Sequence, residues 1–149
     1  MTPEEKIAEL GLELPELAVP AGNFVPTVRT GNLVFTAGQI SRSYYGKLGK
    51  DFTADEGYKA AEESMLYLFS AIKNEIGELS KVKQFIKVLV MVNSTEDFIE
   101  QPKVANGASD LIGKVFGDTG KHGRSAVGFA QLPNNTAVEI EMVVEVKDE

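Results

Sequence analysis

A nearly unbroken apolar run in the middle of the chain limits most strongly what this sequence can fold into. The run lies within residues 82–92, and its central stretch reads Phe85-Ile86-Lys87-Val88-Leu89-Val90-Met91-Val92. A strand that is apolar on both faces is typical of a sheet interior, where other elements cover it. The run therefore predicts an interior strand rather than a strand at a sheet edge.

Two segments with helical periodicity flank this strand. Thr53 and Glu56 form a capping box that opens a long helix, and Gly77 follows as its stop. The apolar stripe of this helix, at three- and four-residue spacing, is Ala61, Met65, Leu68, Ile72 and Ile76. Pro102 opens a second helix that ends near Gly117. Its apolar face is Val104, Ala108, Leu111 and Val115.

Four further strands are expected around these elements. Residues 24–29 and 33–39 surround a turn at 30–32, and residues 125–132 and 137–146 flank Pro133-Asn134-Asn135. Residues 41–51 form a loop. The order ββ-α-β-α-ββ predicts an α+β domain with two main helices on one face of a sheet. The uncovered face keeps large apolar residues, so it is expected to meet another subunit.

The N-terminal residues 1–20 read as an extension with a short helix, capped by Thr2 and closed at Gly11. We expect residues 1–149 to form one domain, since neither a linker nor a repeat divides them. No apolar run approaches the ~20 residues of a membrane span, and the acidic start lacks a signal-peptide pattern. A cytoplasmic protein without membrane contact is therefore expected.

Charge and residue content exclude several classes of site. The net charge of −7 argues against a nucleic-acid partner, because such proteins need a basic face. His122 is the one histidine and there is no cysteine, so neither a zinc site nor a Ser-His-Asp triad is expected. His122 is interpreted as a loop residue. What is left is a site without metal or cofactor, made of Arg, Glu, Asn and backbone amides.

Four motifs, spread from about Ala21 to Val146, resemble those of the Rid (reactive intermediate deaminase, or YjgF) family, often labelled endoribonuclease L-PSP-like. They are Gly31–Gln39 with its terminal Gly-Gln, Val88–Asn93 followed by Phe98, Asn106, and the tail Arg124-Ser125, Leu132-Pro133 and Glu139-Ile140-Glu141. The fifteen-residue step from Arg124 to Glu139 matches the family's tail. Each motif alone is weak, and their order together is specific.

The resemblance implies a chorismate-mutase-like mixed β-sheet and a homotrimer with sites in the clefts between subunits. It implies hydrolysis of small 2-imino acids, or their enamine tautomers, to 2-oxo acids and ammonia. By position, Arg124 would bind the substrate carboxylate through its planar guanidinium, and Glu139 would hold the attacking water. Gly38, Asn106 and the backbone around Ala126 would complete the pocket.

The sequence departs from the archetypal pattern at three site positions. Phe24, Ala37 and Ala126 stand where archetypal members have tyrosine, serine and cysteine. The N-terminal extension and the long 41–51 loop indicate a divergent subgroup. Two interpretations of Tyr44 and Tyr45 in that loop stay open: they replace the missing hydroxyl, or they pack locally.

The spacing of Arg124 and Glu139 adds a geometric condition. Strands advance ~3.3 Å per residue, so the two groups in one chain are expected ~15–20 Å apart. Both can contact one small substrate only if they come from neighbouring subunits. Two other functions stay open: a non-catalytic trimer that binds small carboxylates, and RNA cleavage or translation inhibition. The acidic composition and the lack of an evident histidine base count against the second.

Overall fold

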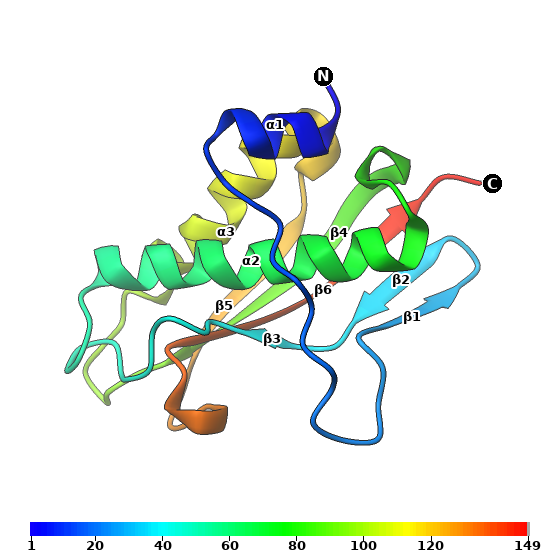
Figure 1. Ribbon diagram of the computed structural model, residues 1–149. Coiled ribbons are helices and arrows are strands. Elements are labelled where there is room, and N and C mark those ends of the chain that lie inside the picture. The colour runs from blue at the N-terminus through cyan, green and yellow to red at the C-terminus, as the bar shows by residue number, and fades with distance from the viewer. Residues whose placement is uncertain (149) are drawn as a thin grey trace.

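The computed structural model describes residues 1–148 and shows one layer of helices on one face of a mixed sheet (Figure 1). The helices are α1 (Pro3–Glu9), α2 (Ala54–Ile76) and α3 (Gln101–Phe116), with short 3₁₀ turns η1 (Leu79–Lys81), η2 (Gly117–Gly120) and η3 (Pro133–Asn135). The strands are β1 (Thr27–Thr30), β2 (Leu33–Thr36), β3 (Gln39–Ile40), β4 (Val82–Asn93), β5 (Gly123–Phe129) and β6 (Val138–Val146).

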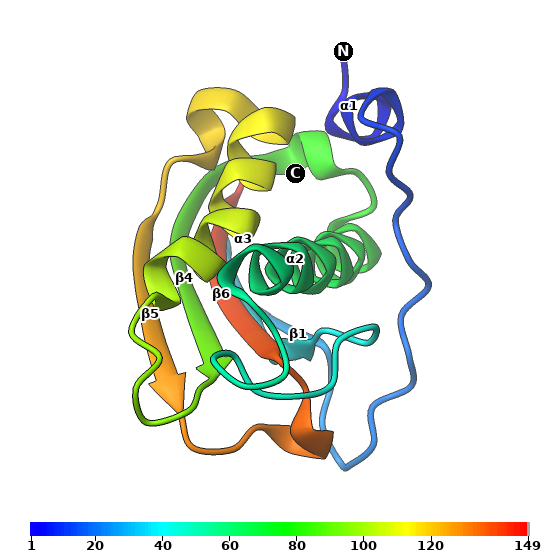
Figure 2. The same cartoon turned by 90° about the vertical axis from the view of Figure 1, so that its left-hand side faces the viewer.

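The apolar run forms β4, which lies between β6 and β5 in the strand order β1-β2-β6-β4-β5, with β3 also pairing with β6. β4 and β5 are parallel, and every other pair is antiparallel. Val88, Val90 and Val92 of β4 have no exposed surface beneath α2 and α3. Figure 2 shows both helices on the same side of the sheet. The predicted α+β class and interior strand are confirmed.

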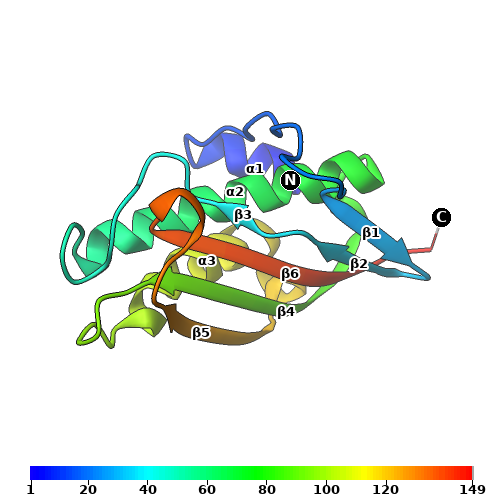
Figure 3. The same cartoon turned by 90° about the horizontal axis from the view of Figure 1, so that it is seen from below.

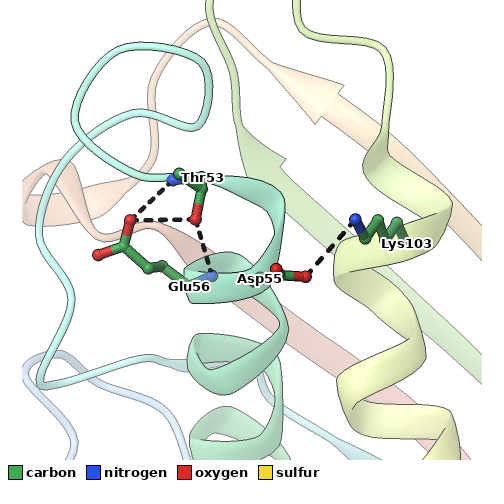
Figure 4. Close-up of polar contacts among 4 residues, drawn as sticks. All are labelled: Thr53, Asp55, Glu56 and Lys103. Carbon is green, nitrogen blue, oxygen red and sulfur yellow. Dashed lines mark hydrogen bonds and ion pairs between the residues drawn. The ribbon is translucent and has the colours of Figure 1, made fainter.

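The start of α2 follows its sequence closely (Figure 4). The Glu56 N–H donates to Thr53 Oγ1 at 3.3 Å, and the Thr53 N–H donates to Glu56 Oε1 at 3.0 Å, which makes the expected capping box. Asp55 in the same turn forms an ion pair with Lys103 of α3 at 3.5 Å. The pair is exposed, so it contributes little energy while joining the two helices.

The strand boundaries near the N-terminus differ from the sequence expectation. Residues 24–26 lie outside β1, because Pro26 has no N–H to donate to a ladder. The Pro26 carbonyl instead accepts from the Ala37 N–H at 2.8 Å, and β3 follows as a separate strand on β6. At the other end, β5 stops at Phe129 because its last partner on β4 is Asn93. The expected strand 125–132 is therefore shifted to 123–129.

Within residues 1–148, no other element covers the face of the sheet turned away from the helices, as the view from below shows (Figure 3). Large apolar side chains are exposed there on four strands: Val28, Leu33, Phe35, Ile86, Val127 and Phe129. The prediction that the uncovered face keeps large apolar residues is confirmed. In the described residues 1–148, none of the helices combines the length and the apolar character that crossing a bilayer would require.

Asn93, fully buried at the end of β4, connects three loops. Its side-chain nitrogen donates to the Gly46 carbonyl (3.2 Å), the Thr136 carbonyl (3.0 Å) and Asn135 Oδ1 (2.9 Å). Its side-chain oxygen accepts from Lys47 Nζ at 2.8 Å. These bonds fix the 41–51 loop against η3, whose Asn134 and Asn135 adopt left-handed backbone conformations with φ of 57° and 60°.

We expect Asn93→Ala to lower the free energy of unfolding by about 2–4 kcal/mol, because buried acceptors lose their donors. Chemical denaturation monitored by circular dichroism measures this loss. Asn74→Ala, an exposed change of the same kind in α2, is the control and should change stability by less than about 0.5 kcal/mol. Equal stability of the two variants would contradict the role given to Asn93.

Candidate active site

The expected site residues fall into two groups in the structure. The first surrounds a cavity of about 250 Å³ at the edge of the sheet, next to β3. Phe24, Gly38 and Glu139 line it, together with Arg42 and Asn134. The sequence had predicted the first three as site residues, although Phe24 and Glu139 are 115 positions apart.

Glu139 reaches the cavity because Gly38 has no side chain. A Cβ atom placed on Gly38 would overlap the Glu139 carboxylate, only 2.9 Å from its Cδ atom. Glu139 is partly buried, and this burial raises the pKa of its carboxyl above the ordinary value of 4.5, with a smaller contribution from the charge of Glu141. A carboxyl with a raised pKa is a better proton acceptor at neutral pH.

The second group lies on β5 and α3, with Arg124 at its centre. Arg124 Nη1 donates to Asn106 Oδ1 at 2.8 Å and to Ser109 Oγ at 3.2 Å. Ser109 Oγ is also 2.9 Å from His122 Nε2, and His122 Nδ1 lies 2.6 Å from the Gly120 carbonyl. The structure thus brings Asn106 to Arg124, as the resemblance implied, and His122 lies in a loop, as expected.

The two groups do not meet within one chain. In the sheet register Glu139 pairs with Met91, which pairs with Val127, so two strand spacings of ~4.8 Å separate β6 from β5 at this level. Arg124 lies three residues, or ~10 Å, further along β5. Arg124 also contacts α3, whereas Glu139 belongs to the uncovered face. The backbone positions are thus ~14 Å apart with side chains on opposite faces.

Two remaining site positions and Tyr44, the first of the two loop tyrosines, are also placed. Ala126 packs against the core on the helix side of β5, two residues from Arg124. Ala37 lies beside Gly38, and its N–H is bound by Pro26. Tyr44 packs edge-on against Phe52, with ring centroids 5.6 Å apart, which favours local packing over a substitute hydroxyl in the Glu139 cavity.

Sequence reasoning missed three residues of this region: Arg42, Ser109 and Asn134. None of the three belongs to a quoted motif, and the folded chain brings each to the cavity or to Arg124. Asn134 carried a weak signal, because asparagine tolerates the left-handed conformation that η3 requires.

Comparison with known proteins finds relatives of this chain. Residues 4–146 match the model of a family described as YjgF/chorismate mutase-like, with a suggested endoribonuclease activity. Protein TCP17 of Trypanosoma cruzi is 42% identical over 95% of this chain and 92% of its own length. A 2-iminobutanoate/2-iminopropanoate deaminase of Dermatophagoides farinae is 26% identical over 91% of this chain and 95% of its own length.

Solved structures of similar proteins share this fold. A Shewanella oneidensis protein, itself given a suggested endoribonuclease activity, superposes with a TM-score of 0.95 at 35% identity, covering 98% of this chain and 100% of that one. The YjgF gene product of E. coli superposes with a TM-score of 0.60 at 23% identity, over 86% and 91% of the two chains, and shows the shared fold.

Proposed function

This chain belongs to the YjgF/chorismate mutase-like family, and we propose that it hydrolyses small 2-imino acids, or their enamine tautomers, to 2-oxo acids and ammonia. The sites would be the clefts between subunits of a cytoplasmic homotrimer. The observation that carries the proposal is the Glu139 carboxyl, held against Gly38 in a cavity and with a raised pKa. The name of the Dermatophagoides relative is consistent with this activity.

The reaction needs one water and two proton movements. Water adds to the carbon of the C=N bond while Glu139 accepts one of its protons, and the imine nitrogen gains a proton. The resulting carbinolamine loses ammonia as its hydroxyl becomes the new carbonyl, so one imine and one water give one 2-oxo acid and one ammonia. A carboxylate that takes and returns a proton is sufficient for these steps.

Arg124 supplies the second requirement, which is to hold the substrate carboxylate. Its guanidinium donates two parallel hydrogen bonds to a carboxylate, and the Asn106 and Ser109 oxygens already orient it. Because Arg124 and Glu139 lie on opposite faces of one sheet, we propose that each site combines Glu139 of one subunit with Arg124 of the next. The apolar uncovered face would form the contact between subunits.

The decisive experiment measures 2-oxo acid released from an imine that an amino-acid oxidase generates in place, with light scattering on the same sample. We expect catalysed release by a trimer. Glu139→Gln should lose this activity. Its matched control is Glu145→Gln, which removes another carboxylate from the same face of β6. A stable monomer at micromolar concentration would contradict the shared site. Salt-resistant RNA cleavage that Arg124→Ala abolishes would favour the endoribonuclease activity instead.

The raised pKa of Glu139 predicts a pH-dependent effect on stability. The fold disfavours the ionised carboxyl, so stability is lost as pH rises from the unfolded value of 4.5 through the raised folded pKa. Glu139→Gln removes this loss. We therefore expect the variant to be more stable than the parent at about pH 7 and equally stable at about pH 4. Urea unfolding at both pH values measures the difference; a gain of the same size at both would contradict the titration.

Gly38→Ala tests whether Gly38 positions the carboxylate. The added methyl group displaces the flexible end of Glu139 rather than backbone, so we expect little change in thermal stability. Turnover should fall by at least about tenfold, since a displacement near 1 Å can cost a catalytic group a hundredfold. Gly113→Ala, where a Cβ meets no atom within 4 Å, is the control. Parental turnover in Gly38→Ala would show that Glu139 needs no fixed position.

A further inference from the structure

Arg42, which follows β3, lines the same cavity as Glu139 but forms no ion pair with any residue of 1–148. Its Nε–H group is buried and donates to no acceptor in the described part of the chain. A buried donor and a positive charge without an anion are unfavourable unless something compensates them. In a protein with a net charge of −7, such an arginine at a cavity indicates an anionic ligand.

Contacts with α2 and with the neighbouring loop hold Arg42 at the cavity. The Arg42 N–H donates to Glu63 Oε1 of α2 at 2.6 Å, and the neighbouring Ser43 N–H donates to the same oxygen at 2.9 Å. On the other side, Ser41 is fully buried and its Oγ lies 2.8 Å from Thr136 Oγ1. The guanidinium carbon stacks 4.9 Å from the centre of the Tyr67 ring. Stacking leaves the N–H groups at the guanidinium edge able to bind a carboxylate.

Arg42 is held by a hydrogen bond of its backbone N–H and by stacking of its guanidinium face on Tyr67. Neither contact pairs the guanidinium with an anion. The Glu63 carboxylate accepts hydrogen bonds from the Arg42 and Ser43 N–H groups and from Ser43 Oγ. Glu139 lines the same cavity but forms no ion pair with Arg42. The cavity is therefore lined by a positive group, Arg42, and by a separate carboxylate, Glu139, which is the proposed base.

We propose that Arg42 binds a second carboxylate on the substrate, so that the preferred substrates are 2-imino dicarboxylates. The inference rests on the proposed function, because it takes the C=N carbon to lie beside Glu139 and the first carboxylate at Arg124 of the neighbouring subunit. The acidic end of the substrate side chain then points to Arg42, past the apolar wall that includes Phe24. A cavity of about 250 Å³ suits such a small molecule. The second carboxylate stays unchanged in the reaction.

Calorimetric titration with two stable product analogues tests this inference. The monocarboxylate is 2-oxobutyrate and the dicarboxylate is 2-oxoglutarate, each titrated into the parent, Arg42→Gln and Lys50→Gln. We expect the parent to bind 2-oxoglutarate more tightly by about tenfold or more, the worth of one charge-assisted hydrogen bond. Arg42→Gln should lose this preference and keep its 2-oxobutyrate affinity. Lys50→Gln removes the same charge from an exposed position of the same loop and should behave as the parent.

Arg42→Lys keeps the positive charge without the planar fork and guards against a folding defect in Arg42→Gln. It should fold as the parent does and retain only part of the preference. The inference is overturned if the parent shows no preference for the dicarboxylate, or if the preference survives in Arg42→Gln. Failure of the proposed function would be seen separately. If the parent does not bind 2-oxobutyrate, or if Arg124→Lys binds it as tightly as the parent, the Arg124 site is wrong whatever the result for Arg42.

Discussion

Glu139→Gln is expected to lower imine turnover by roughly a hundredfold or more while 2-oxobutyrate binds nearly as tightly as to the parent. Glutamine keeps the shape of the side chain, so the cavity beside Gly38 stays filled. It cannot accept a proton from water, so the addition to the C=N carbon loses its base. An effect on turnover without an effect on binding is what distinguishes a base from a group that holds the substrate.

Arg124→Lys should instead weaken binding of the carboxylate. The lysine keeps the charge but loses the planar fork, and 2-oxobutyrate binding should weaken by about 1.5–3 kcal/mol. Calorimetry and timed imine hydrolysis on the same two variants separate the roles. If both residues were only surface charges, each change would alter stability by less than ~0.5 kcal/mol and turnover not at all. Parental turnover in Glu139→Gln would show that another group holds the water.

Local chemistry explains why most of the fold was predictable. Thr53 and Glu56 start α2 because their capping bonds lie within one helical turn, and Gly77 ends the helix with a positive φ. The run that forms β4 is apolar enough to require neighbours on both sides. The β1 and β2 boundaries failed because the break depends on where Pro26 lies relative to Ala37, across the hairpin. This hydrogen bond joins residues eleven positions apart, so a pattern of neighbouring residues does not predict it.

The candidate site was predictable only where a motif marks it. Arg124 and Asn106 are 18 positions apart and hydrogen-bonded, and Gly38, between β2 and β3, lies against the Glu139 side chain of β6. Arg42 was not predicted, because an arginine in a polar loop is usually solvated. Its significance depends on Glu63 and Tyr67, which the fold brings to it from α2. Packing between distant segments, rather than residue type, makes it a candidate ligand-binding group.

Mixing two inactive variants should restore activity if the site is shared between subunits. Arg124→Ala lacks the carboxylate clamp and Glu139→Gln lacks the base, so each alone should retain no more than roughly a hundredth of parental turnover. In randomly assembled trimers, half of the subunits carry an intact Arg124 and the other half an intact Glu139. Each interface thus has one chance in four of combining both, and about a quarter of parental turnover should return.

A second mixture makes the test quantitative. The parent is combined in equal amounts with a chain that carries both substitutions, and the subunits are exchanged by unfolding and refolding together. A site shared by two subunits requires both to be parental, which leaves about a quarter of the activity, whereas a site within one chain leaves about half. Differently tagged chains verify that hybrids form. Hybrid trimers in which the two single variants restore nothing, while the second mixture keeps half, would place Arg124 and Glu139 in separate sites and remove the shared cleft.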